Sequence, residues 1–79
     1  MQSYFERRGP RLDTGLPSVR HVQELIRTRA MVGLHLVGGE VLRGTLRWQD
    51  HDFLALEPEP GRPLVLINRN SVAVLRSLG

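Results

Sequence analysis

The sequence predicts a small, mostly β domain: one amino-terminal α-helix followed by a strongly bent, five-stranded antiparallel sheet, in effect a small open barrel. Two observations predict this class. After Ala30 the apolar residues change from a helical period to a period of two. Clusters of Gly, Pro and Asp then divide the remaining chain into short segments. A length of 79 residues fits one domain.

The helix is expected to begin at Pro17, because proline suits the first helical turn, where its missing N–H costs nothing. Apolar residues then recur at helical spacing and form one narrow stripe: Val19, Val22, Leu25 and Ile26. Residues 1–15 carry charge, Gly and Pro without an apolar period, so we expect a flexible tail there. The folded domain is expected over residues 16–79.

The first two strands are expected to form a hairpin. Apolar residues alternate from Val32 to Leu36, and Gly38-Gly39 is a two-residue turn signal because such turns need positive φ. The second strand is expected to start at Glu40. We expect one of its faces to carry Leu42, Gly44, Leu46 and Trp48, with the glycine allowing a strong bend.

Three further strands are expected at residues 53–56, 64–67 and 72–75. Turn residues QDHD precede the first of these, and the loop EPEPGRP precedes the second, since its prolines cannot continue a ladder. Between the last two strands stand three polar residues, Asn68-Arg69-Asn70. A strand that served only the core would not place an arginine there.

Composition excludes several classes of protein. There is no Cys, and the three His share no ligand spacing, so we expect no disulfide, metal site or cofactor. No nucleophile or phosphate-binding loop is recognisable, so we expect no enzymatic activity. No apolar run approaches the roughly 18 residues of a membrane span, and no signal peptide is visible, so a soluble, cytoplasmic protein is expected.

All eleven basic residues are Arg, and the net charge is +3. Arginine is favoured where planar, bidentate contact with phosphate or carboxylate matters. A codon bias toward arginine explains the same composition without any function. The charge is compatible with nucleic-acid binding and does not by itself demonstrate it.

Two motifs resemble those of the Sm-like fold, and in particular the bacterial Hfq family. The first is LHLVGGEVLRGTLRWQDHDFLAL, with Gly39, Gly44 and Asp50 in the expected order, and the second is the shorter LINRNSVAVL. The initial helix LPSVRHVQELI also fits this family, and the resemblance covers residues 16–77. The Trp-Gln-Asp step and the altered second motif look most like the divergent Hfq proteins of cyanobacteria.

The resemblance implies a ring of six copies, in which the fourth strand of one subunit pairs with the fifth strand of the next. Such pairing hides both sheet edges and adds apolar burial to a short chain. The alternative is a monomeric barrel of the SH3 type.

The resemblance also implies a central pore that contacts uridine-rich RNA. Arg69 matches a basic pore position, and Asn70 matches a pore histidine. His51 and Asp52 occupy the place of a Gln-Phe pair, and Asp52 would repel phosphate. The structural alternatives are that Arg69 and Asn70 shape their turn and that Asp52 caps the turn after Asp50.

Two further surfaces follow from the resemblance. Arg27 and Arg29 match an arginine-rich rim, although arginine on a helix is usually only solvated surface. An adenine-reading surface on the opposite, distal face is weakened by departures from the family pattern. The residues there are His35, Gly39, Glu40 and Arg43, with Val74 in place of a hydroxyl-bearing residue.

We therefore expect an RNA-binding riboregulator that acts after transcription, holding small RNA and messenger RNA weakly through its pore and rim. The alternative is a hexameric adaptor that acts mainly on a protein. In that case an acidic peptide would bind the helix-bearing face, since arginine grips carboxylates in bidentate fashion. The residues expected on that face are Arg20, Gln23, Asn68 and Arg69.

Overall fold

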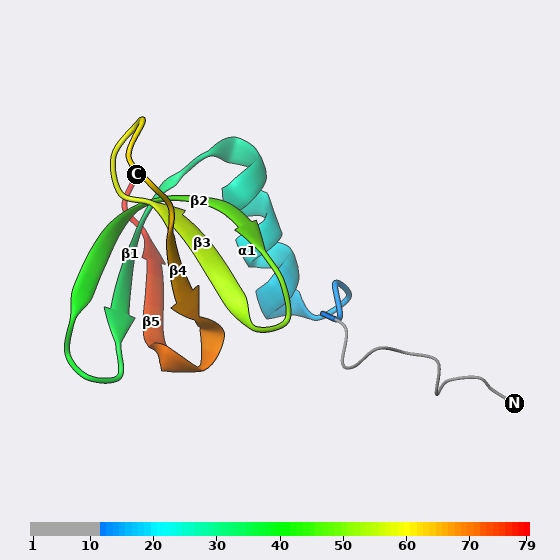
Figure 1. Ribbon diagram of the computed structural model, residues 1–79. Helices are drawn as coiled ribbons and strands as arrows, with labels where there is room; N and C mark the ends of the chain where they lie inside the picture. The colour runs from blue at the N-terminus through cyan, green and yellow to red at the C-terminus, as the bar shows by residue number, and fades with distance from the viewer. Residues whose placement is uncertain (1–11) are drawn as a thin grey trace, which may run out of the picture.

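A computed structural model describes residues 12–79, so residues 1–11 of the predicted tail lie outside the described part of the chain. One helix precedes five strands, as predicted (Figure 1). The elements are α1 (Pro17–Thr28), β1 (Met31–Leu36), β2 (Val41–Gln49), β3 (Phe53–Glu57), β4 (Val65–Asn68), the short 3-10 helix η2 (Arg69–Ser71) and β5 (Val72–Ser77).

The helix α1 begins at Pro17, as the sequence predicts, and it ends in an unusual way. Arg29 adopts a left-handed conformation with φ of 56°. Its N–H donates to the Ile26 carbonyl, and the N–H of Ala30 donates to the Leu25 carbonyl. This is the pattern of a Schellman cap, which glycine usually closes because a side chain is disfavoured at that backbone conformation.

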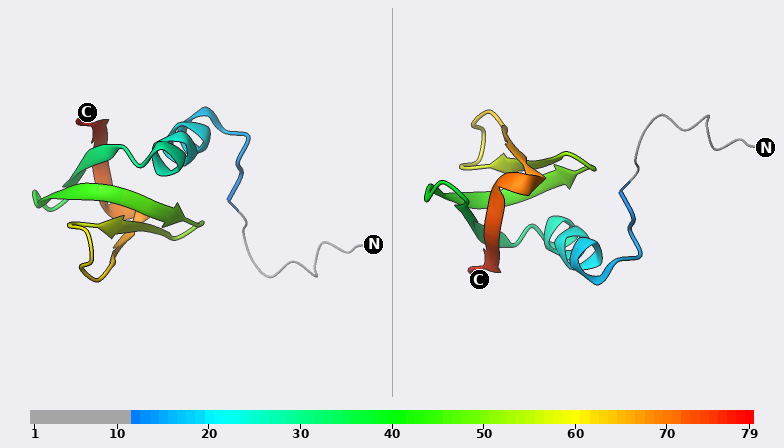
Figure 2. Two further views of the ribbon diagram at one scale, coloured as in Figure 1. Left: turned by 90° about the horizontal axis from the view of Figure 1, so that it is seen from above. Right: turned by 90° about the horizontal axis from the view of Figure 1, so that it is seen from below.

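The five strands form one antiparallel sheet in the order β4-β3-β2-β1-β5. Figure 2 shows the strands curling around a common centre, with α1 to one side. The helix packs against β2. Since β4 and β5 have one neighbour each, both edges of the sheet are open within this chain.

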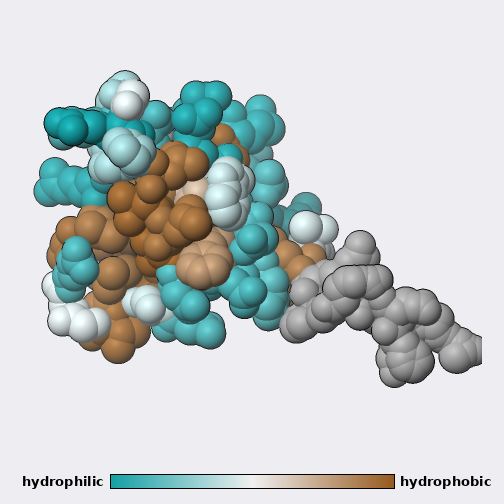
Figure 3. Space-filling view, viewed as in Figure 1, coloured by the Kyte–Doolittle hydropathy of each residue, from teal (hydrophilic) through white to brown (hydrophobic). Residues whose placement is uncertain are grey.

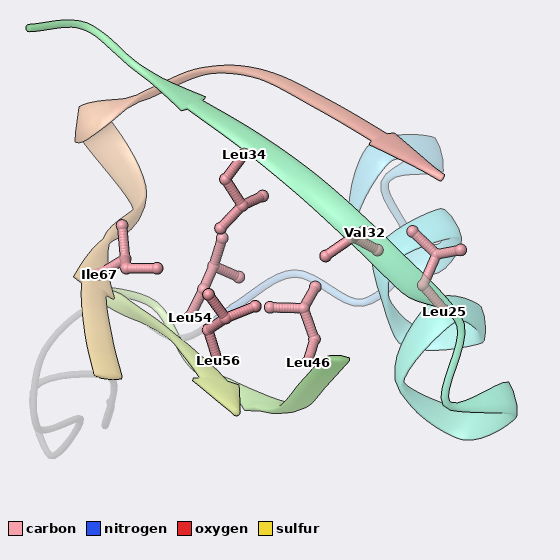
Figure 4. Close-up of a cluster of buried hydrophobic side chains, with 7 residues drawn as sticks. All are labelled: Leu25, Val32, Leu34, Leu46, Leu54, Leu56 and Ile67. Atoms are coloured by element: carbon pink, nitrogen blue, oxygen red, sulfur yellow. The ribbon is translucent and has the colours of Figure 1, made fainter. Parts of the chain in front are cut away.

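The centre of the curl is an apolar core. Figure 4 shows the buried side chains pointing toward one another from the helix and four strands: Leu25, Val32, Leu34, Leu46, Leu54, Leu56 and Ile67. No polar side chain among residues 12–79 is buried with them. The core therefore holds the fold together, and polar chemistry is left to the surface.

The hairpin between β1 and β2 is present, but its predicted two-residue turn is wrong. The Leu36 N–H donates to the Glu40 carbonyl, and the Gly39 N–H donates to the Leu36 carbonyl. Only Gly39 of the glycine pair has positive φ, at 100°. The loop is thus three residues long, a turn followed by one left-handed residue, and β2 begins at Val41 rather than Glu40.

Gly44 allows β2 to pass close to another part of the chain. A Cβ at this position would overlap the Glu57 carbonyl oxygen and lie 2.9 Å from the Pro58 Cα. Both obstacles are backbone atoms, which cannot rotate away. A residue without a side chain is therefore required at this point of β2, and the reason is this close approach.

A β-bulge overturns the predicted face of Trp48. Leu46 pairs with Leu56, but Trp48 pairs with Ala55, so the register shifts by one residue. The extra residue, Arg47, resets the alternation of side chains. Leu46 is therefore fully buried while Trp48 is 40% exposed, on the opposite face from the one predicted.

Candidate functional site

The four residues predicted to face a pore lie around one pocket beside the start of α1. His51, Asp52, Arg69 and Asn70 line it, and its volume is about 330 Å³. We call it the helix-side pocket. The other lining residues, which the sequence did not single out as site residues, are Leu12, Asp13, Leu16, Ser18 and Val19.

The turn between β2 and β3 supplies one wall of this pocket. The Asp50 carboxylate accepts hydrogen bonds from the N–H groups of Asp52 (2.9 Å) and Phe53 (2.7 Å). Asp50 thus has a structural role, because its carboxylate caps the turn. The alternative in which Asp52 caps this turn is wrong, because Asp50 does so. The side chains of His51 and Asp52 are exposed beside the pocket.

The turn between β4 and β5 supplies an adjoining wall. The Asn68 side-chain oxygen accepts from the Asn70 N–H at 2.8 Å and caps η2. The N–H of Arg69 donates to the Asp52 carbonyl at 2.8 Å, which ties the two turns together. Arg69 and Asn70 form part of the short helix that makes this turn, and the side chain of Asn68 caps it.

The Arg69 side chain is half-buried and held in place by a glutamine. Its Nη1 donates to Gln49 Oε1 at 2.8 Å. Gln49 Nε2 donates in turn to Gln23 Oε1 at 2.9 Å and to the Val19 carbonyl at 3.3 Å. Gln49 has no signal in the sequence that marks it as a site residue, because only the bulge in β2 turns it toward the helix.

The two predicted rim arginines are in different situations. Arg27 donates to the Glu24 carboxylate from both Nε (3.1 Å) and Nη2. This hydrogen bond lowers the pKa of Glu24 and raises the pKa of Arg27. Arg27 also lines a second pocket of about 280 Å³ with Arg20 and Gln23, whereas Arg29 is not among its lining residues.

The residues predicted on the distal face follow the β1–β2 hairpin. His35 pairs with Val41 in the ladder and Arg43 pairs with Gly33, so both side chains lie on one face of the sheet. Gly39 occupies the turn, where its backbone conformation accounts for it. Glu40 is exposed beside it.

Within residues 12–79 no group of three or more His, Asp or Glu side chains is arranged to hold a metal ion. No helix of this part is long and apolar enough to cross a membrane.

Comparison with known proteins points to one family. A family profile described as Hfq related matches residues 16–77. A crystal structure of an Hfq protein from Anabaena sp. superposes with a TM-score of 0.70 and is 31% identical in sequence, covering 78% of this chain and 97% of that chain. No curated protein sequence matches. The Anabaena structure agrees with the cyanobacterial type that the sequence motifs predict.

Proposed function

The chain belongs to the Hfq-related family and has its Sm-like fold, and from this premise we propose that it is a ring-forming RNA-binding regulator. Its role would be to hold small RNA and messenger RNA through the helix-side pocket. Arg27 and Arg29 would add a weaker rim contact.

The observation that carries this proposal is the position of Arg69. Arg69 lines the helix-side pocket together with His51 and Asn70, and within residues 12–79 no carboxylate forms an ion pair with its side chain. An unneutralised arginine with hydrogen-bond donors facing a pocket suits a phosphate or a base carbonyl oxygen. Six copies around one axis would concentrate this charge.

The open edges of the sheet support assembly into a hexameric ring. Both edge strands carry exposed apolar residues: Leu66 is 50% exposed on β4, and Val74 is 41% exposed on β5. Figure 3 shows apolar side chains gathered on the face that carries β3 and β4. An exposed edge with apolar side chains is an aggregation risk unless another strand covers it, and β4–β5 pairing between subunits would cover both edges.

Register identifies the groups that such pairing would use. Arg69 donates its N–H to the Asp52 carbonyl of the neighbouring turn, and hydrogen-bonded pairs alternate along an antiparallel ladder. Because the direction of the N–H alternates along the strand, Val65 points its N–H toward β3, as Arg69 does. The N–H of Leu66, between them in this alternation, points to the open edge. Leu66→Pro removes an outward donor and suits an edge strand, so it should yield a folded subunit that no longer assembles.

Light scattering and circular dichroism test this assembly. We expect a hexameric mass for the wild type and a smaller, folded species for Leu66→Pro. Val65→Pro is the matched control, since it removes an inward donor and should unfold the subunit. A wild-type protein that is monomeric at micromolar concentration would contradict the ring.

RNA binding is tested directly by titration with poly-U and poly-A at two salt concentrations. We expect poly-U to bind better than poly-A, with an affinity that falls steeply as salt rises, because phosphate contacts release counterions. We expect binding weaker than nanomolar, since the Asp52 carboxylate shares the pocket with Arg69. Absence of salt-dependent binding to either polymer would rule out this function.

A second candidate function is a protein adaptor, which the same pocket also favours. Arg69 reaches Gln23 of α1 through Gln49, so two of the residues expected on a protein-binding face are linked. A mixed set of donors with the two carboxylates of Asp13 and Asp52 suits a peptide with few acidic side chains better than a polyanion. A pull-down that compares Arg69→Glu with Arg43→Glu tests it, with loss expected only for the Arg69 variant.

A further inference from the structure

We propose that Gln49 is a positioning residue, which holds the Arg69 guanidinium at the helix-side pocket without neutralising its charge. This role rests on the proposed function, because it matters only if Arg69 contacts an anionic ligand. Gln49 lies at the end of β2 and not in either of the two turns that line the pocket. It contacts Arg69, and Arg69 would contact the ligand.

The bulge in β2 places Gln49 where it can act. Continuous alternation from the buried Leu46 would have turned Gln49 to the outer face of the sheet. The extra residue at the bulge reverses this, and Gln49 pairs with the buried Leu54. The same irregularity that exposes Trp48 therefore brings the Gln49 amide between α1 and the turn after β4.

The hydrogen bonds determine how the amide is oriented. A guanidinium has donors and no acceptor, so it requires the oxygen of the Gln49 amide, and Nη1 lies 2.8 Å from that atom. The Val19 carbonyl has no donor, so it requires the nitrogen, which lies 3.3 Å away. Gln23 Oε1 accepts from the same nitrogen at 2.9 Å. An amide turned the other way would lose these contacts.

Comparison with the ion-paired arginines shows why a neutral partner matters. In the described chain Arg27 pairs with Glu24, Arg47 with Glu57 and Arg62 with Glu59. Each of these three cations is matched by a carboxylate within 4 Å. Arg69 is instead hydrogen-bonded to an amide, which restricts the side chain without forming an ion pair.

Restriction of Arg69 should favour binding. A free arginine loses considerable rotamer freedom when a ligand immobilises it, and a side chain held beforehand avoids most of that cost. One N–H of the guanidinium is used by Gln49, and the others remain for the pocket lined by Ser18, His51 and Asn70. A phosphate or a uracil carbonyl oxygen fits these donors.

Two substitutions separate position from charge. Gln49→Glu is nearly isosteric and keeps the acceptor for Arg69, but it turns the tether into an ion pair and loses the donor to Val19 and Gln23. Gln49→Met keeps the length and removes the tether. Each Gln49 substitution is made alone and in combination with Arg69→Ala. Binding of a fluorescent oligouridylate to each assembled variant is measured by anisotropy at several salt concentrations. Light scattering and circular dichroism confirm assembly and folding.

We expect Gln49→Glu to weaken binding by about tenfold and to flatten its salt dependence, since the charge of Arg69 is compensated. Gln49→Met should weaken binding by roughly two- to fivefold with an unchanged salt slope, because only the position of the charge is lost. Neither substitution should weaken binding further when Arg69 is already alanine, since the two residues act as one unit.

The outcomes distinguish the two levels of the proposal. If Arg69→Ala binds RNA as tightly as the wild type, the helix-side pocket is not the RNA site, and the proposed role of Gln49 is wrong as well. If Arg69→Ala weakens binding but the Gln49 substitutions do not, only the positioning role is wrong. Equal losses in both backgrounds also overturn it, because Gln49 would then serve only to dock α1. If the Gln49→Met variant does not fold, the RNA affinity and salt dependence of Gln49→Glu alone test the positioning role.

Discussion

The helix-side pocket and the distal face each contain residues that the sequence identified, but the two surfaces differ in how those residues are held. In the pocket, hydrogen bonds join the turn after β2, the turn after β4 and α1 through Arg69 and Gln49. On the distal face, His35 and Arg43 lie along one hairpin as neighbouring strand positions.

This difference shows where binding specificity can arise. A hairpin face presents side chains at intervals that the ladder sets, whereas converging turns can bring donors and acceptors from distant parts of the chain to one point. Arg69 and Gln49 are 20 residues apart and within hydrogen-bond distance. We therefore expect the pocket, rather than the distal face, to carry most of the function, and the following predictions test that contrast.

The largest effect is expected from Gly44→Ala, which should destabilise the whole domain and so disrupt both the helix-side pocket and the distal face. The added Cβ would overlap the backbone of Glu57 and Pro58, and backbone obstacles yield only if β2 and β3 separate. We expect a loss of more than about 3 kcal/mol in the free energy of unfolding, measured by urea denaturation. Gly38→Ala is the matched control, since nothing lies within 4 Å of its Cβ position. A stable Gly44→Ala variant would contradict the close approach.

The next effect is on RNA affinity, and it compares one arginine from each surface. Arg69→Ala should weaken poly-U binding by roughly tenfold to a hundredfold, the value of a charged hydrogen bond lost from a partly buried site. Arg43→Ala should weaken it by less than about threefold, as expected for an exposed cation. Filter binding at fixed salt measures both. A larger loss for Arg43 would reverse the ranking of the two surfaces.

A gain of RNA affinity is expected when the Asp52 carboxylate is removed from the pocket. Asp52 lines the same pocket as Arg69, and a negative charge there repels phosphate. Asp52→Asn should tighten poly-U binding by about two- to fivefold at low salt and less at high salt. Glu40→Gln, on the distal face, should leave poly-U binding unchanged. An equal gain from both substitutions would show that only net charge matters.

The smallest effect concerns the rim and depends on pH. The hydrogen bond from Arg27 lowers the pKa of Glu24, so the charged pair stabilises the helix above the pKa that Glu24 has in the unfolded chain. That contribution is lost as pH falls through the lowered, folded-state pKa. NMR titration should show the pKa of Glu24 rising toward its ordinary value in Arg27→Ala. An unchanged titration would mean that the pair is not formed in solution.

The sequence determined the order of the elements and the identity of the family, because these depend on local patterns. The switch in apolar period after Ala30 identified the helix and the first strand. Pro17 and Asp50 act through their own backbone or their neighbours in the chain. Gly44 stood out in the sequence as a glycine inside a strand, but its reason is the distant backbone of Glu57 and Pro58. The four pocket residues were identified through the resemblance, and the structure places them together.

Only the tertiary structure decided which face the end of β2 presents. A bulge depends on the register in which two strands pair, and no local sequence pattern around Arg47 predicts it. One extra residue exposed Trp48, which the sequence placed inward, and turned Gln49 toward the helix, where it holds Arg69. Local propensities act over a few residues, but the partner of a polar side chain is chosen by chain segments that meet only after folding.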